Sequence, residues 1–322
     1  MKRLSGRKAS LQPLKGKVIG IIGFGPQGRV QAELLKRQGF KVVVGVRKGQ
    51  SWKAAEKAKH KVMTITEATL AADLLLVLVS DTAHREVMDK HVVPFLRPGQ
   101  TVVFAQGYSV AFNEVHLPWF VDVILIAPSA PAKEMLDLFA RKQGVPASVG
   151  VGNNFSGKAV KTALALCRTL GFTRKFMLWS SFREEGITDL FSEQGPIVGG
   201  LVELMKASFE TLVKAGYSPE VAYSCCVLEP YYVARLIHEQ GIHGMLSRVS
   251  ETAKYGALTV GPQIIGKAVR KELRKALKRI ESGEFMRELQ RNRHRLPELL
   301  DREARSEIEQ TRRKLLAPPQ RG

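Results

Sequence analysis

Short apolar runs recur along the first half of the chain, and the stretches between them are long enough for helices. The runs are residues 17–22, 41–46, 73–79, 101–104 and 122–126. Their short length and their content of Val, Ile and Leu predict buried strands. Because strands that alternate with helices form parallel sheets covered on both faces, the pattern predicts an α/β domain with a Rossmann-type, doubly wound parallel sheet.

A glycine-rich sequence follows the first predicted strand directly. Residues 23–28 read Gly-Phe-Gly-Pro-Gln-Gly, a helix-like segment ends at Gly39, and the second predicted strand comes next. The order of strand, G-x-G-x-x-G, helix and strand predicts a dinucleotide-binding unit, in which backbone N–H groups approach the pyrophosphate. The candidate cofactor-binding residues of this loop are Gly23, Phe24, Gly25, Gln27 and Gly28.

The end of the second predicted strand indicates which cofactor is bound. An acidic residue at this point holds the adenosine ribose of NAD, whereas a basic residue accommodates the 2′-phosphate of NADP. Residues 46–52 include Arg47, Lys48 and Ser51 and no acidic residue. We therefore expect NADP(H), with these three side chains at its 2′-phosphate.

Candidate site residues also follow the other three predicted strands. Asp81 comes after the third run, Gln106 and Gly107 come after the fourth, and Ser129 comes after the fifth. Ligands of parallel sheets bind outside the carboxyl ends of the strands. We therefore expect these four residues near the nicotinamide end of the cofactor.

A pair of carboxylates in the second half of the chain has metal-ligand spacing. Asp189 and Glu193 are four residues apart, so on a helix they project from the same face, with Leu190 and Phe191 buried beside them. Two carboxylates at one spot repel each other unless a cation lies between them, and magnesium often uses only one or two protein carboxylates. The pair indicates a magnesium site, with a solvated helix face as the alternative.

Composition adds a strong positive charge to this picture. The 322 residues are enough for two domains, and no apolar run approaches the ~20 residues that span a membrane. Three cysteines provide no disulfide framework, so a cytoplasmic location is expected. The net charge of +20 attracts anionic ligands. Much of it lies in late helical segments that carry no nucleic-acid motif, so no nucleic-acid partner is expected.

Three longer sequences identify a family. Residues 182–185 read Phe-Arg-Glu-Glu, residues 188–194 read Thr-Asp-Leu-Phe-Ser-Glu-Gln, and residues 250–256 read Ser-Glu-Thr-Ala-Lys-Tyr-Gly. With these sequences the chain, from about Leu14 to Leu289, resembles the short form of the ketol-acid reductoisomerases. These are the acetohydroxy-acid isomeroreductases of valine and isoleucine synthesis.

The resemblance implies an NADP-binding domain over residues 1–181 and an all-helical, knotted domain over residues 182–322 that dimerises. It also implies a homodimer or higher homo-oligomer and a small anionic 2-keto or 2-hydroxy acid as substrate. In the family, two magnesium ions bind the substrate oxygens while a methyl or ethyl group migrates, and NADPH then delivers hydride.

The resemblance assigns roles to individual residues of the helical domain. Asp189 and Glu193 match the first metal-binding pair, and Ser250 matches a serine that contacts the substrate carboxylate. Of the second metal-binding pair only Glu229 matches, because Cys225 replaces a carboxylate, and cysteine is a poor ligand for magnesium. One magnesium ion is therefore expected, and the second metal site is in doubt.

Two strand-end residues also depart from the family. Gln106 replaces a histidine, and Ser129 replaces a lysine. An imidazole and a cation are thus missing from the expected active site, although Lys133 lies four residues after Ser129 and is a candidate to compensate.

These departures leave three functions open. The favoured expectation is an NADPH- and magnesium-dependent reductase of a 2-keto acid or related carbonyl, with impaired or absent alkyl migration. The alternatives are a complete ketol-acid reductoisomerase and a non-catalytic NADP-binding homologue. Two further residues are expected to have no catalytic role: His84 lies at the surface, and Cys225 is buried like an apolar side chain.

Overall fold

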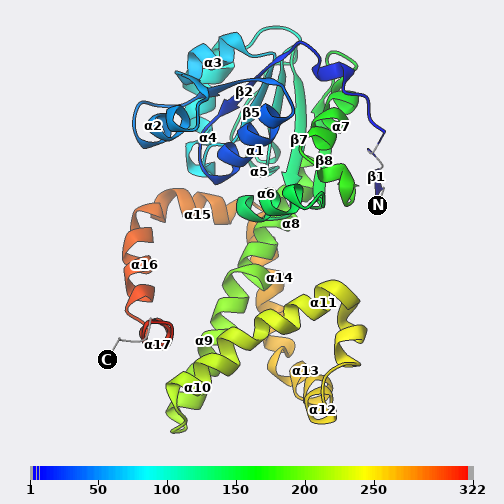
Figure 1. Cartoon of the computed structure of the whole chain (residues 1–322). Coiled ribbons are helices and arrows are strands. Elements are labelled where there is room, and N and C mark those ends of the chain that lie inside the picture. The colour runs from blue at the N-terminus through cyan, green and yellow to red at the C-terminus, as the bar shows by residue number, and fades with distance from the viewer. Residues whose placement is uncertain (1–2, 5, 7, 318–322) are drawn as a thin grey trace, which may run out of the picture. The chain divides into compact units, whose positions relative to one another are not determined.

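The computed structural model describes residues 3–4, 6 and 8–317 (Figure 1). The chain divides into two compact units, Met1–Thr188 and Asp189–Gly322. The division falls within helix α8 (Phe182–Ser192), whose first residue is where we expect the helical domain to begin.

Unit 1 (Met1–Thr188) is built on a nine-stranded sheet of order β1-β9-β8-β7-β6-β5-β2-β3-β4. All five apolar runs form strands, and these pair in parallel, which confirms the predicted Rossmann-type sheet. Two antiparallel pairings, β7 with β8 and β1 with β9, extend it. The strands are β1 (Arg3–Leu4), β2 (Val18–Ile22), β3 (Lys41–Gly45), β4 (Lys61–Met63), β5 (Leu74–Val77), β6 (Thr101–Phe104), β7 (Asp122–Pro128), β8 (Ala147–Asn153) and β9 (Met177–Trp179).

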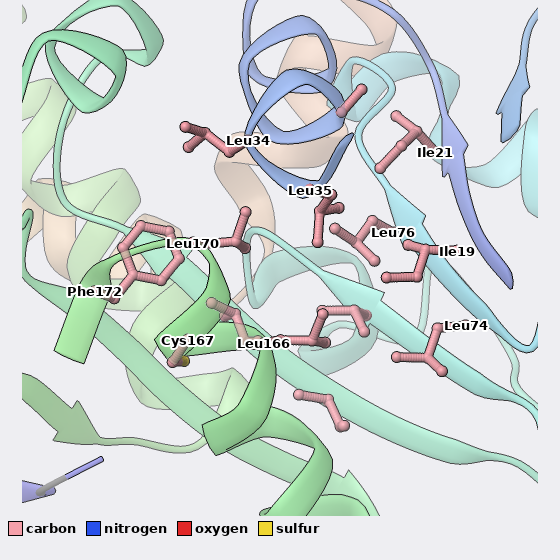
Figure 2. Close-up of a cluster of buried hydrophobic side chains, with 14 of the residues drawn as sticks. Ile19, Ile21, Leu34, Leu35, Leu74, Leu76, Leu166, Cys167, Leu170 and Phe172 are labelled. Atoms are coloured by element: carbon pink, nitrogen blue, oxygen red, sulfur yellow. The ribbon is translucent and has the colours of Figure 1, made fainter. Parts of the chain in front are cut away.

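Helices cover both faces of this sheet. Figure 2 shows one face, where Leu34 and Leu35 of α1 and Leu166 of α7 pack with Ile19 and Ile21 of β2. Alternate residues of the same strands point to the opposite face and pack against α3 and α4, as strand geometry requires. The helical segments of unit 1 are η1 (Gln12–Leu14), α1 (Pro26–Arg37), α2 (Gln50–Lys57), α3 (Ile65–Ala71), α4 (Asp81–Val87), η2 (Met88–Val92), η3 (Val93–Phe95), α5 (Tyr108–Ala111), α6 (Ala132–Ala140), α7 (Ala159–Thr169) and η4 (Phe172–Arg174).

In the described part of unit 2 (Asp189–Gly322) every element of regular secondary structure is a helix, in agreement with the predicted helical domain. Its small core of Phe209, Ala222 and Tyr223 packs against Ile308 near the C-terminus. No helix among residues 8–317 is both long and apolar enough to cross a membrane. The segments after α8 are η5 (Glu193–Ile197), α9 (Gly199–Lys214), α10 (Pro219–Tyr223), η6 (Ser224–Leu228), α11 (Glu229–Leu246), α12 (Glu251–Thr259), α13 (Gly261–Ile264), α14 (Lys267–Glu281), α15 (Glu284–Asn292), η7 (Arg293–Arg295), α16 (Leu296–Ala304) and α17 (Glu307–Leu315).

Two π-helical turns of unit 2 lie at prolines. Pro196 lies inside η5, and Pro230 lies in the first turn of α11, directly after η6. Proline has no N–H for the i→i−4 ladder, so a wider turn next to it accommodates the missing bond. The π-turns begin at or border the predicted metal ligands Glu193 and Glu229, which fits the frequent occurrence of such turns at functional sites.

Candidate functional site

A cavity of about 410 Å³ opens in unit 1 beyond the carboxyl ends of β2, β3 and β5. It lies where the strand order reverses from β2 to β5, which is the usual ligand position in a doubly wound sheet. Val79 and Ser80 form one wall, after β5. Six of the predicted cofactor-binding residues line it, namely Gly23, Phe24, Gly25, Arg47, Lys48 and Ser51.

The glycine loop is shaped by close backbone packing. Gly23 has φ of +100°, and a Cβ at this position would lie 2.7 Å from the Leu78 carbonyl oxygen. A Cβ on Gly28 would lie 2.3 Å from the Gly23 oxygen, whereas a Cβ on Gly25 would meet nothing within 4 Å. Gly25 is also the N-cap of α1 and supplies no capping side chain, so the helix start remains open to an anion. Gly23 and Gly28 are thus required for close backbone packing, whereas Gly25 leaves space for a ligand beside the cavity.

We predict that alanine substitutions at Gly25 and Gly28 have opposite consequences. Gly25 has φ of −72°, so Gly25→Ala keeps the thermal midpoint but fills the space that a pyrophosphate needs, and NADPH affinity falls by about tenfold. Gly28→Ala forces the α1 start away from Gly23 and lowers Tm by roughly 2–8 °C. Calorimetric titration and thermal melting measure the two quantities. Equal melting losses in both variants would contradict this division of roles.

Cationic and hydroxyl groups gather at the other end of the cavity. Arg47 and Lys48 are exposed after β3, and Ser51 lies half-buried in the first turn of α2. The N-cap of α2, Gly49, provides no side-chain cap. Two positive side chains, a hydroxyl and open helix N–H groups form a suitable environment for a phosphate.

The remaining predicted cofactor residues have different surroundings. Gln27 accepts a hydrogen bond from Gln31 at 3.2 Å and is not part of the cavity lining. Gly107 donates its N–H to the buried carboxylate of Glu185, and a Cβ on Gly107 would lie 2.0 Å from the Phe182 oxygen. Packing against α8 thus accounts for the glycine at 107. Asp81 begins α4, and its side chain lies outside the described residues.

Three polar side chains form a cluster where β5 and β6 end, with His84 and Ser109 buried and Gln106 half-buried. The imidazole of His84 on α4 lies 2.9 Å from Ser109 Oγ and 3.3 Å from Gln106 Nε2. Its other nitrogen lies 3.2 Å from the Val79 carbonyl oxygen. The prediction that His84 lies at the surface is wrong, because only 2% of its surface is exposed. It also places an imidazole beside Gln106, where the sequence indicated only an amide.

Ser129 and Lys133 lie at the end of β7. Ser129 is exposed, and its backbone N–H bonds the Pro146 oxygen at 2.9 Å. Lys133 is exposed on α6. Neither side chain takes part in the His84 cluster, so a compensating role for Lys133 stays a prediction.

In unit 2, Asp189 and Glu193 lie one turn apart at the junction of α8 and η5. Both residues are exposed, and the Asp189 carbonyl accepts the Ser192 hydroxyl at 2.9 Å. Leu190 and Phe191 are half-buried, so they are less enclosed within the chain than the sequence indicated. The pair is accessible to an ion from solvent.

The second predicted metal-binding pair lies at the η6–α11 junction. Cys225 is exposed, which contradicts the expected burial, because the wide turn of η6 directs it outward beside Glu229. Desolvation, and then the Glu229 carboxylate to which the thiol is hydrogen-bonded, raise the pKa of Cys225. Because metals bind the thiolate, the raised pKa makes Cys225 a poorer metal ligand.

Ser250 has a structural role of its own. It is the N-cap of α12, where its hydroxyl accepts the Ala253 N–H at 3.2 Å and lies 3.0 Å from Thr252 Oγ1. N-caps of this kind stabilise helices by about 1 kcal/mol. Its predicted contact with a substrate carboxylate stays a prediction.

The described part of the chain contains no group of three metal-ligating side chains close enough to hold an ion together. Asp189 and Glu193 still have the donor chemistry of a magnesium site, because this ion commonly takes one or two carboxylates and completes its shell with water and substrate. They fit one ion held in this way. Among the described residues, Glu229 joins no such group.

Sequence reasoning missed two parts of the site in unit 1. His84 lies three residues after Asp81, so on a helix it turns back toward the sheet, and this spacing was the available signal. Glu185 belongs to a sequence that identified the family, yet its bond to Gly107 joins residues 78 positions apart and left no local pattern.

Comparisons with known proteins agree over both units. Residues 13–175 match the model of the acetohydroxy acid isomeroreductase NADPH-binding domain, and residues 182–319 match the ketol-acid reductoisomerase C-terminal domain. The chain is 45% identical over 283 residues to "Ketol-acid reductoisomerase (NADP(+))" of Pyrobaculum aerophilum, covering 88% of this chain and 86% of that protein. The Pyrobaculum calidifontis protein of the same name is 43% identical and covers 97% of both chains.

A solved structure is similar over the whole length. An NADH-preferring ketol-acid reductoisomerase from an uncultured archaeon is 35% identical, with a TM-score of 0.93, and covers 99% of this chain and 100% of its own.

Proposed function

Since the chain belongs to the ketol-acid reductoisomerase family, we propose that it catalyses the complete reaction of that family, alkyl migration followed by reduction with NADPH. The chain is an oxidoreductase with an NADP-binding domain. The observation that carries the finer proposal is the extent of the likeness, because relatives named for this activity align across both domains at 43–45% identity. The substrates would be 2-acetolactate and 2-aceto-2-hydroxybutyrate.

The cavity of unit 1 supports the cofactor part of this proposal. The 2′-phosphate would lie at Arg47, Lys48 and Ser51, and the pyrophosphate would face the start of α1 beside Gly25. The loops that follow β5 and β6 would then enclose the nicotinamide half, because β5 and β6 lie on the opposite side of β2 from β3. The chain orients the cofactor and excludes water, and the nicotinamide carries the hydride.

Asp189 and Glu193 would hold magnesium, with water and substrate oxygens as its other ligands. Bound magnesium supplies positive charge that stabilises the substrate oxygens and polarises the carbonyl. Glu229 would act on the substrate side as a carboxylate, and the neighbouring Cys225 would donate a hydrogen bond to it. Ser250 would bind the substrate carboxylate through its hydroxyl while it caps α12.

A homo-oligomer is the proposed assembly. Unit 2 leaves large apolar side chains exposed, among them Val202, Tyr231, Tyr255 and Leu258. Apolar surface of this extent is typical of protein–protein contacts.

A second candidate function is reduction without migration, which the sequence alone favoured. It is supported by the three altered positions Gln106, Ser129 and Cys225. The similarity to complete reductoisomerases now favours the full reaction. A reductase would need only the cofactor, a polarised carbonyl and a proton source.

Two substrates separate these functions. NADPH oxidation is followed with magnesium and either 2-acetolactate or 3-hydroxy-3-methyl-2-ketobutyrate, in which the methyl group has already migrated. The proposal predicts turnover of both at comparable rates. Turnover of only the second substrate would replace the proposal with the reductase, and NADPH binding without turnover of either would indicate a non-catalytic protein.

A further inference from the structure

His84 connects the two strand-end loops of unit 1 that follow β5 and β6. These strands are parallel neighbours, and each strand ends two residues before the group that His84 contacts, namely Val79 after β5 and Gln106 after β6. The ring packs at 5.9 Å from the Phe104 ring, at the sheet end. Ser109, with 1% of its surface exposed, completes the contact. One buried side chain therefore bridges adjacent loops.

Backbone groups fix the direction of these hydrogen bonds. The Ser109 N–H can only donate, so the Gln106 atom that it contacts at 3.2 Å is the amide oxygen. The amide nitrogen then faces Ser109 Oγ at 2.7 Å and His84 Nδ1 at 3.3 Å, and it donates to both. His84 Nδ1 is consequently an acceptor, and its proton resides on Nε2, which donates to the Val79 carbonyl at 3.2 Å.

The cluster has a defined position relative to the cavity. Val79 lines the cavity wall, and its carbonyl is the group that the imidazole holds. In the strand order, β3 with Arg47 lies on one side of β2, and β5 and β6 lie on the other. A dinucleotide laid across this reversal has its 2′-phosphate near Arg47 and its nicotinamide half toward the loops that His84 joins.

We propose that His84 is a positioning residue for the nicotinamide half of the cofactor. It acts through the Val79 carbonyl and the Gln106 amide, which it holds at a fixed separation, and it has no contact with the reacting atoms. The inference rests on the proposed binding of NADPH in the cavity of unit 1. Loss of the imidazole removes a hydrogen-bond partner from the Val79 carbonyl, the buried Ser109 hydroxyl and the Gln106 amide, and the two loops lose their common anchor.

The test compares two ligands that share the 2′-phosphate. NADPH has the nicotinamide half, and adenosine 2′,5′-bisphosphate lacks it. For His84→Phe, we expect NADPH affinity to fall by about tenfold, while affinity for the bisphosphate stays within about twofold. His84→Gln, whose amide has both a donor and an acceptor, should recover most of the NADPH affinity. His116→Phe is the matched control, because His116 is exposed.

Each outcome decides the inference. Selective loss of NADPH affinity with rescue by His84→Gln supports it, and the same selective loss in Ser109→Ala would support the shared anchor with a variant that changes little volume. Equal weakening of both ligands would show that His84 only stabilises the fold. Unchanged NADPH affinity in His84→Phe would also overturn it. Failure of the wild-type chain to bind NADPH is a different result, because it would remove the proposed function itself.

Discussion

Asp189→Asn is expected to lower kcat/KM for 2-acetolactate by at least about a hundredfold, with NADPH affinity unchanged. Asparagine has nearly the shape of aspartate, so the helix junction at α8 and η5 is retained and only the negative charge is lost. A neutral amide competes poorly for magnesium, which prefers carboxylate oxygen. Initial rates with varied magnesium should show saturation displaced to higher concentration.

The matched control is Glu210→Gln, which also removes one exposed carboxylate from unit 2. Glu210 pairs with Lys214 at 3.5 Å on the surface of α9, and surface pairs contribute little. Its kinetics should match those of the wild type. If Asp189→Asn keeps wild-type turnover and magnesium dependence, Asp189 and Glu193 form only a solvated helix face, and the proposed metal site is withdrawn.

The second large effect concerns cofactor choice. Replacing both Arg47 and Ser51 by aspartate should lower the affinity for NADPH by about a hundredfold and change the affinity for NADH by less than about threefold. The variant places two carboxylates where the 2′-phosphate would lie, whereas an acid at this position can accept the ribose hydroxyls of NADH. Dissociation constants for the two cofactors provide the measurement.

Lys53→Asp is the appropriate comparison, because Lys53 is an exposed cation of α2 that does not line the cavity. The substitution changes the local charge outside the cavity lining and should lower the affinity for NADPH only slightly at physiological salt. Equal losses of NADPH and NADH affinity in the double variant Arg47→Asp, Ser51→Asp would refute the NADP assignment. The question is open to experiment because the structurally similar archaeal reductoisomerase prefers NADH.

The sheet was predictable where burial leaves a continuous apolar sequence. Residues 73–79 contain the four fully enclosed positions of β5, and their composition alone indicated a strand. β8 was missed because Gly150 and Gly152 interrupt its apolar pattern, and β4 was missed because only three residues pair at the sheet edge. These segments form strands because they pair with strands distant in the sequence, and their local composition alone gives little indication of this pairing.

The residues of the candidate site were likewise predictable only where neighbouring positions in the sequence carry the chemistry. The glycine loop and Arg47 were identified because contiguous residues carry their chemistry. The His84 cluster was hidden because Gln106 and His84 are 22 positions apart, and neither type of side chain has a pattern that predicts its partner. The exposure of Cys225 depends on the π-turn of η6, which no hydrophobic periodicity indicated.

The π-turn η5 accommodates one extra residue before α9. A π-turn contains one residue more than the α-turn it replaces, and its wider winding absorbs that residue within a single turn. Deleting a single residue between Glu193 and Ile197 would therefore restore an α-turn and leave the later side chains of α9 close to their present directions. In evolutionary terms, the wide turn lets the chain gain or lose one residue next to Glu193 without changing which face of α9 follows it.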